Sequence, residues 1–368
     1  MKFKHRLQHT DRFLLRWSRR DLNMEEFQEE FHTWNSEINW PIFIDHAQKG
    51  HLAGYFLENV KEAQLTIPED VQLQLERYQQ KILMHHMFLL EFLLELNKHL
   101  KDIDHVFLKG WDLAIRGYSS FKVRQISDID ILVNPEQLPA LIEVLTVLGA
   151  KVVKMDYKSE FHKKDEEIHA PIQAYYNGIS IDVHTRLFSS LLPYKLDTIE
   201  LLDKKENHAF HQQQFHLLSE KDAALFCCLH AHKHIAGGFL LKVAVINDFS
   251  YYRMDDLMTY AKQHDAKNEC LAMIELREEI NQGHEKVTFF TLTFFRFLSQ
   301  RNIYFFEALI HTLGNFRSVS LNFRKPKLLF YSIFPKKSYL KAFGQGPYLC
   351  LWFKRTTNFF TVFLKNAK

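Results

Sequence analysis

Residues 106–134 read VFLKGWDLAIRGYSSFKVRQISDIDILVN, and this stretch decides the fold that we expect for the chain. The pattern predicts a strand, a turn at Lys109-Gly110, a short helix, an irregular loop and a second strand that carries Asp128 and Asp130. Side chains alternate between the two faces of a strand, so the apolar residues between the aspartates enter a core and both aspartates share the opposite face.

Two aspartates on one face of an apolar strand indicate a metal site. Neighbouring carboxylates raise each other's pKa unless they share a cation. The pair therefore favours a divalent ion between Asp128 and Asp130, and the alternative is two solvated acids on an edge strand.

A second strand repeats the pattern. Residues 179–185, ISIDVHT, alternate so that three apolar side chains face one side while Ser180, Asp182 and His184 face the other. An ordinary amphipathic strand would look the same, but three acids on two core strands are harder to explain as surface decoration. We therefore expect Asp182 to join the first two aspartates in an active site.

Composition bounds the rest of the chain. The 368 residues are 46% hydrophobic and 25% charged with only 12 glycines, which allows two or three domains with more helix than strand. The sequence starts without an apolar signal region, and it has no run of about 18 apolar residues that would predict a membrane-spanning helix. The four cysteines form no CxxC pair, so we expect free thiols in a cytoplasmic protein.

Charge is distributed unevenly along the chain. Residues 308–368 hold 11 Lys or Arg and no acid, which leaves 36 basic against 44 acidic residues elsewhere. The aromatic rings between these cations are typical of a segment that binds an anionic partner, either nucleic acid or a membrane surface. The alternative, which we adopt as the default, is the amphipathic edge of a helical domain with its rings buried.

The sequence before and after the two strands is mostly helical in its spacing of apolar residues. We expect a solvated amphipathic element over residues 1–36, a loop over 186–217, and a long helix up to about residue 100 that opens on a capping box from Thr66 to Glu69.

A later helix should begin at Ser219 and carry His230, Lys233 and His234 on one face. The two histidines have the i, i+4 spacing of a metalloprotease helix, but the Glu of HExxH is absent, so we do not expect zinc. An anionic ligand contacted by Lys233 and simple packing of the histidines both remain open.

These motifs resemble one known family, the nucleotidyltransferases of the polymerase-β-like superfamily that have an LKG…R…DIDxLV core followed by an IDxH strand. The matching residues are Leu108-Lys109-Gly110, Tyr118, Arg124, the run from Asp128 to Val133, His169, the run from Ile181 to His184, His230, Lys233-His234 and Asp248. The likeness runs from about residue 40 onward, and the order of its motifs makes it specific.

The resemblance implies an α+β fold in which a small mixed β-sheet nucleotidyltransferase core is flanked by mainly helical N- and C-terminal regions. We accordingly expect a helical region over residues 1–100, the α/β core over 101–195, and a helical domain with the basic aromatic tail over 196–368.

The resemblance also implies a reaction, the Mg²⁺-dependent transfer of a nucleoside monophosphate from an NTP to an unknown hydroxyl acceptor. Asp128, Asp130 and Asp182 would be the catalytic residues and would hold two Mg²⁺ ions, which stabilise the entering and leaving oxygens. The acceptor could be a small molecule, a peptide, a protein or an RNA end. The alternative is a non-catalytic nucleotide- or nucleic-acid-binding regulatory protein on the same scaffold.

Nucleotide binding would fall to Lys109, Gly110, Arg124, His230 and Lys233, with the cations neutralising the triphosphate and the glycine allowing its close approach. The wider superfamily has Gly-Ser or Gly-Gly after its first strand. Here a tryptophan follows the glycine, so either the lysine compensates or nucleotide binding is altered.

Overall fold

The structure is a computed structural model of the 368-residue chain. It describes residues 2–6, 9–153, 172–188, 194–236, 247–248, 250–252, 256–282 and 286–290, with backbone only for 2–6, 233–236 and 286–290. His169 and the basic aromatic tail over 308–368 lie outside the described residues.

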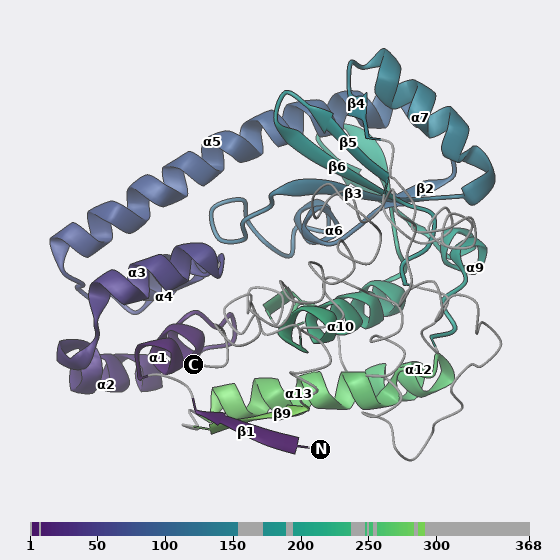
Figure 1. The fold of residues 1–368 in the computed structure, drawn as a ribbon. Coiled ribbons are helices and arrows are strands. Elements are labelled where there is room, and N and C mark those ends of the chain that lie inside the picture. Colours follow the sequence, from purple (N-terminus) through teal and green to yellow (C-terminus); the bar gives the residue numbers. More distant parts are fainter. Residues whose placement is uncertain are drawn as a thin grey trace, which may run out of the picture.

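A seven-stranded mixed sheet forms the centre of the described fold, with strand order β4-β5-β6-β3-β2-β8-β7 (Figure 1). Its strands are β2 His105–Phe107, β3 Asp128–Val133, β4 Lys151–Val152, β5 Ile172–Tyr176, β6 Ile179–His184, β7 Glu206–Phe210 and β8 Gln213–Leu217. Strand β3 is antiparallel to β2 and parallel to β6, and β2 is parallel to β8. The two strands that carry the predicted acids are therefore neighbours, and the α+β fold is confirmed.

The predicted loop over 186–217 is wrong. This region contains helix α9 Thr198–Asp203 and the hairpin of β7 and β8, which extends the sheet past residue 195. The hairpin turns at His211 and Gln212, which have φ values of 44° and 61°. Tight hairpin turns with such φ values are normally marked by Asn or Gly, and neither residue occurs here, so the sequence carries no turn signal.

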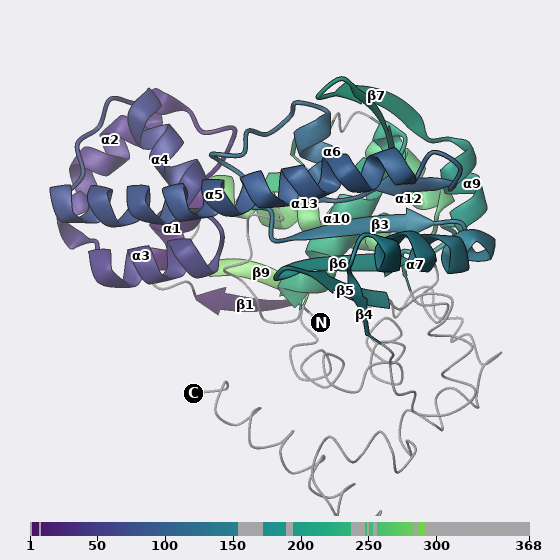
Figure 2. The ribbon, with the colours of Figure 1, turned by 90° about the horizontal axis from the view of Figure 1, so that it is seen from above.

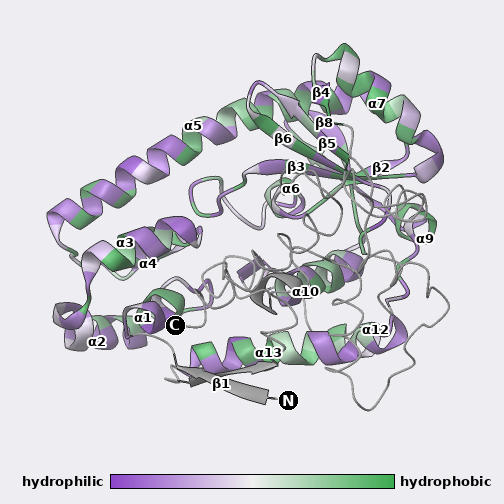
Figure 3. Ribbon diagram, in the orientation of Figure 1, coloured by the Kyte–Doolittle hydropathy of each residue, from purple (hydrophilic) through white to green (hydrophobic). Residues whose placement is uncertain are grey.

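One face of the sheet is covered by the C-terminal half of the long helix α5 Glu69–His99 and by α7 Leu138–Val147, which follows the short turn η2 Pro135–Gln137. Ile129 and Ile131 of β3 enter this core beside Leu93 and Leu96 of α5, as the alternation predicted. Figure 3 shows hydrophilic and hydrophobic residues mixed along α5, as expected of a helix with one buried face.

The predicted capping box of α5 is wrong, because the helix begins at Glu69 with Pro68 as its N-cap and no side chain caps it. Ile67 directly precedes Pro68 and is therefore driven toward extended backbone, which keeps the helix from starting before the proline.

The N-terminal region is helical, with α1 His9–Trp17, α2 Met24–Trp34, η1 Asn35–Glu37, α3 Trp40–Lys49 and α4 Ala53–Glu62. Helix α5 runs from these helices to the sheet (Figures 1 and 2). The amphipathic pattern expected over 1–36 is present in α1 and α2, but the element is not simply solvated, because Trp17 and Phe27 are fully buried. The charged neighbours of these rings face outward while the rings pack between the helices. The many charged residues in this stretch therefore hide how deeply its aromatic side chains are buried.

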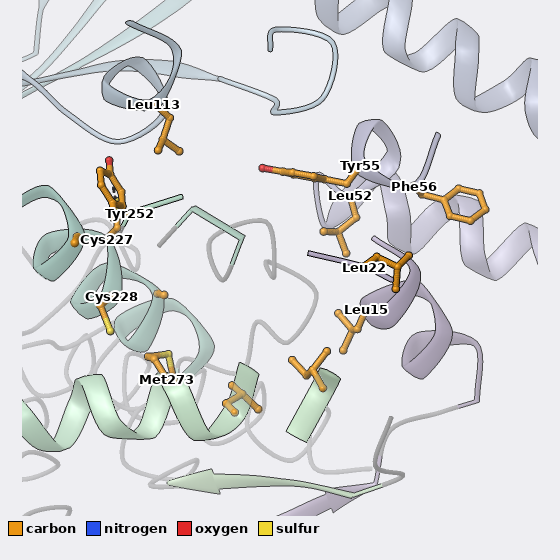
Figure 4. Close-up of a cluster of buried hydrophobic side chains, with 14 of the residues drawn as sticks. Leu15, Leu22, Leu52, Tyr55, Phe56, Leu113, Cys227, Cys228, Tyr252 and Met273 are labelled. Atoms are coloured by element: carbon orange, nitrogen blue, oxygen red, sulfur yellow. Dashed lines mark hydrogen bonds between the residues drawn. The ribbon is translucent and has the colours of Figure 1, made fainter. Parts of the chain in front are cut away.

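A second core joins the N-terminal helices to α10 Glu220–Ala236, α12 Leu257–Gln263 and α13 Lys267–Asn281. Figure 4 shows part of it, with Leu15 and Tyr55 on one side and Cys228 and Met273 on the other. Strands β1 Lys2–Arg6 and β9 Lys286–Phe290 form a separate antiparallel pair.

Two further expectations concern membranes and thiols. Within the described part of the chain, the helices are too short or too polar to cross a membrane. Cys227, Cys228 and Cys270 are buried free thiols, as expected, and Cys350 lies outside the described residues.

Candidate active site

The register between β3 and β6 brings the predicted acids together. Asp130 lies opposite Asp182, and two residues along Leu132 lies opposite His184. One donor atom each from Asp130, Asp182 and His184 lie within 4.8 Å of one another. Two acids that are 52 positions apart in sequence thus meet because two parallel strands place them side by side.

Asp130 is the buried centre of the cluster, with 1% of its surface exposed. Its Oδ1 accepts hydrogen bonds from Lys109 Nζ at 2.5 Å and lies 3.0 Å from His184 Nε2. Burial opposes ionisation of this carboxyl, but attraction to the Lys109 ammonium and the bonds from His184 outweigh it and lower the pKa of Asp130. The group is therefore an anion that already has a cationic partner.

Asp182 is held less completely. Ser180 hydrogen-bonds its carboxyl, but Oδ1 is buried and has no hydrogen-bond partner. Burial and then repulsion from Asp130 raise the pKa of Asp182, and Lys109 only partly opposes them. A buried carboxylate oxygen without a partner is costly, so this atom requires a further donor or a cation.

Asp128 stands at the start of β3, opposite Ser180, and Ser127 Oγ donates to its Oδ1 at 3.2 Å. Burial raises the pKa of Asp128, followed by repulsion from Asp130, and attraction to Lys109 partly opposes them. Asp182 also repels it. All three predicted carboxylates therefore share one electrostatic environment, with Asp128 at its edge.

The residues present fit a divalent cation. Two carboxylates and an imidazole lie within reach of one ion, and one carboxylate oxygen is buried without a partner. Carboxylate oxygens suit Mg²⁺ and Mn²⁺, and an imidazole nitrogen shifts preference toward transition metals. An Asp-Asp-His cluster in the described residues could thus hold a metal ion.

Two features describe the Lys109-Gly110 turn, whose contact with phosphate stays a prediction. A Cβ on Gly110 would lie 3.0 Å from Cγ1 of Ile126, so this glycine packs closely against the loop before β3. Lys109, at φ 58° and ψ −123°, is the residue with left-handed backbone, although it has a side chain. The ammonium of Lys109 enters the carboxylate cluster, where burial would lower its pKa but the charges of Asp130 and Asp128 raise it.

Trp111 faces away from the cluster. Its ring is fully buried in the core beneath the sheet, and its Nε1 donates to the backbone oxygen of Asp128 at 3.1 Å. Helix α6 Gly110–Ile115, which carries it, is therefore tied to the first residue of β3. The tryptophan positions an acid, and its bulk does not lie among the three carboxylates.

Arg124 is bound to a distant partner. Its guanidinium makes a bidentate ion pair with Asp248, at 2.6 Å from Nε and 2.7 Å from Nη2, and it also donates to the backbone oxygen of Gln125. Both side chains of the pair are nearly buried. The pair joins the loop before β3 to a segment 124 residues later, and contact of Arg124 with phosphate stays a prediction.

Among the remaining predicted nucleotide-binding residues, His230 and Lys233 lie in α10. The ring of His230 lies 5.8 Å from the ring of Phe226, one turn earlier in the helix. The side chain of Lys233 lies outside the described part of the structure. Binding of nucleotide by these two residues stays a prediction.

A family model described as an uncharacterised nucleotidyltransferase matches residues 36–292. The chain belongs to this family. The predicted resemblance is confirmed, and the nucleotidyltransferase assignment covers the sheet, α5 and the helices that follow the sheet. A search of curated proteins found no match.

The sequence motifs gave no role to two residues that lie at or near the carboxylate cluster. His184 shares the polar face of β6 with Asp182, and that alternation could have placed it in the metal cluster. His86 of α5 is buried and bonds the backbone of Phe121 and Ile126, which fixes the loop before β3. No local pattern distinguishes such a histidine from any other on a helix.

Proposed function

We propose that the protein transfers a nucleoside monophosphate from an NTP to a hydroxyl acceptor in a Mg²⁺-dependent reaction. The family assignment indicates nucleotidyl transfer, and one observation supports the metal requirement. Asp130 and Asp182 lie opposite each other on neighbouring strands, and a buried oxygen of Asp182 has no partner.

In this proposal Asp130 and Asp182 hold the metal together with Asp128 at the edge of the cluster, and His184 is available as a nitrogen ligand. Two Mg²⁺ ions bound there would withdraw charge from the attacking and leaving oxygens. The acceptor oxygen bonds to the α-phosphorus, the bond from that phosphorus to pyrophosphate breaks, and the hydroxyl proton passes to a base.

The residues around the carboxylates would bind the nucleotide and support the strand that carries Asp128 and Asp130. Lys109 is a cation already inside the cluster, so its charge can offset that of the triphosphate. Trp111 and His86 would keep β3 and its preceding loop in place, because both bond the backbone there. Arg124, His230 and Lys233 are retained as proposed nucleotide contacts.

The test incubates the full chain with Mg²⁺ and each of the four labelled NTPs in turn. The readouts are nucleotide binding, pyrophosphate release and transfer of the label to molecules of a cell extract. We expect Asp130→Asn and Asp182→Asn to lose metal-dependent NTP binding and transfer. Asp102→Asn, an exposed acid in the turn before β2, removes the same charge and should keep both.

Two results would count against the proposal. Metal-independent NTP binding that survives in both cluster variants would leave the carboxylates without the assigned role. Binding of NTP without release or transfer under any condition would favour the non-catalytic nucleotide-binding alternative.

A further inference from the structure

The ammonium of Lys109 contacts Asp130, one of the three residues that could hold a metal ion. Lys109 Nζ lies 2.5 Å from Asp130 Oδ1, and the same oxygen is bonded to His184 Nε2. The lysine side chain is 20% exposed and the aspartate side chain 2% exposed, so water screens this pair only weakly. Asp128 and Asp182 also attract the ammonium, which makes it a shared counter-ion for three carboxylates.

The backbone of Lys109 supports a specific role for its side chain. The residue lies between β2 and α6 at φ 58°, a conformation that glycine adopts without strain and other residues adopt at a cost of roughly 1–3 kcal/mol. It is fixed on both sides, because Leu108 N–H donates to the backbone oxygen of Asp130 and Leu113 N–H donates to that of Lys109. A lysine at a position that favours glycine supports a role for the ammonium, because its Nζ reaches the carboxylate cluster.

We propose that Lys109 is the resident counter-ion of the metal site. When a divalent ion binds Asp130, the Lys109 ammonium leaves this carboxylate and moves to the triphosphate, whose charge it then offsets. This proposal rests on the proposed function and adds how the site changes between its empty and loaded forms. The ammonium and a divalent ion cannot share Asp130 Oδ1 without strong repulsion. The lysine stem has four methylene groups, so the ammonium can leave the aspartate while the backbone stays fixed.

Metal binding to the nucleotide-free protein tests the first half of the proposal. Free Mn²⁺ is followed by electron paramagnetic resonance while it is titrated into the full chain, the variant Lys109→Met and the control Lys101→Met. Lys101 is exposed in the turn before β2, so its variant removes the same charge away from the cluster. We expect Lys109→Met to bind Mn²⁺ about tenfold more tightly or better, with the control within about twofold of the parent.

Lys109→Gly is a second variant that removes the ammonium and relieves the backbone strain, so it keeps the test valid if Lys109→Met folds poorly. Unchanged or weaker Mn²⁺ binding by a folded Lys109 variant overturns the proposal. In that case the lysine is a fixed structural partner of Asp130.

Nucleotide binding tests the second half. With saturating Mg²⁺, a non-hydrolysable NTP should bind both Lys109 variants about tenfold more weakly than the parent, because the ammonium no longer reaches the phosphates. Tighter Mn²⁺ binding without this loss overturns the transfer of charge to the nucleotide. Failure of the proposed function would appear in the parent chain as absent pyrophosphate release, or in the Asp130 and Asp182 variants as metal-independent NTP binding. Failure of the Lys109 proposal appears in the Mn²⁺ and NTP affinities of the Lys109 variants, so the two failures are distinguishable.

Discussion

The backbone N–H of Ile126 donates a hydrogen bond of 2.8 Å to Nε2 of His86, two residues before Asp128. Nδ1 of the same ring lies 3.0 Å from the backbone oxygen of Phe121 and donates to it, since Nε2 is the acceptor. The ring thus holds the loop segment between Phe121 and Ile126, which leads into β3. It must be neutral to donate from one nitrogen and accept at the other.

This bonding predicts a pH dependence of stability. Burial lowers the pKa of His86 from 6.5 to about 4, so between these values the unfolded chain takes up a proton that the folded chain does not. Stability therefore falls as the pH drops from about 6.5 to 4, by roughly 3 kcal/mol from this residue. In urea unfolding experiments across this pH range, His86→Gln should reduce the slope of the unfolding free energy against pH by the equivalent of about one proton.

His85→Gln is the control for this prediction, because His85 is the neighbour on α5 that points to a more exposed side. Burial also lowers the pKa of His105 to about 4, and that contribution is present in every variant. Parallel stability curves for the parent and His86→Gln would show that the imidazole does not titrate as described.

The buried Arg124–Asp248 ion pair predicts that substitutions at the two positions have strongly non-additive effects on the free energy of unfolding. Arg124→Met leaves the Asp248 carboxylate buried without its guanidinium, which should cost about 3–5 kcal/mol in the free energy of unfolding. The double variant Arg124→Met with Asp248→Leu removes both charges and should recover more than half of that loss. Additive losses in denaturant unfolding of the two single variants and the double variant would contradict the coupling.

His184 is expected to bind the metal directly. His184→Gln should weaken Mn²⁺ binding by at least about tenfold and should weaken Mg²⁺ binding less, because an imidazole nitrogen favours transition metals. Calorimetric titration of both ions measures this difference, with His99→Gln at the exposed end of α5 as the control. Equal losses for both ions would mean that His184 only orients Asp130.

Trp111 is expected to support β3 through its indole N–H. Trp111→Phe keeps most of the buried ring but leaves the backbone oxygen of Asp128 without its donor, so stability should fall by roughly 1–3 kcal/mol. Trp40→Phe, at a partly buried ring on α3, should cost less. Denaturant unfolding compares the two, and an equal loss would remove the special role of the Trp111 hydrogen bond.

The sequence by itself determined the strands that carry Asp128, Asp130 and Asp182 and the face on which these acids lie. Those features follow from the two-residue period of a strand, which any stretch such as DIDILV displays locally. The long helix before the first strand is equally local, because its apolar stripe has helical spacing.

Only the tertiary structure decided which residues meet. The register of β3 on β6 sets Asp130 against Asp182 and brings His184 to the same oxygen as Lys109. Such pairings depend on contacts between segments far apart in the chain, and the periodicity of one strand says nothing about its neighbour's register.

The same reason explains why the sequence missed the β7–β8 hairpin and the partner of Arg124. The hairpin turn uses His211 and Gln212 in a conformation that their residue types do not signal. Asp248 lies 124 residues after Arg124 in the sequence, so only the folded chain brings the two together. Local chemistry therefore specified the candidate acids, while non-local packing assigned each of them its neighbours.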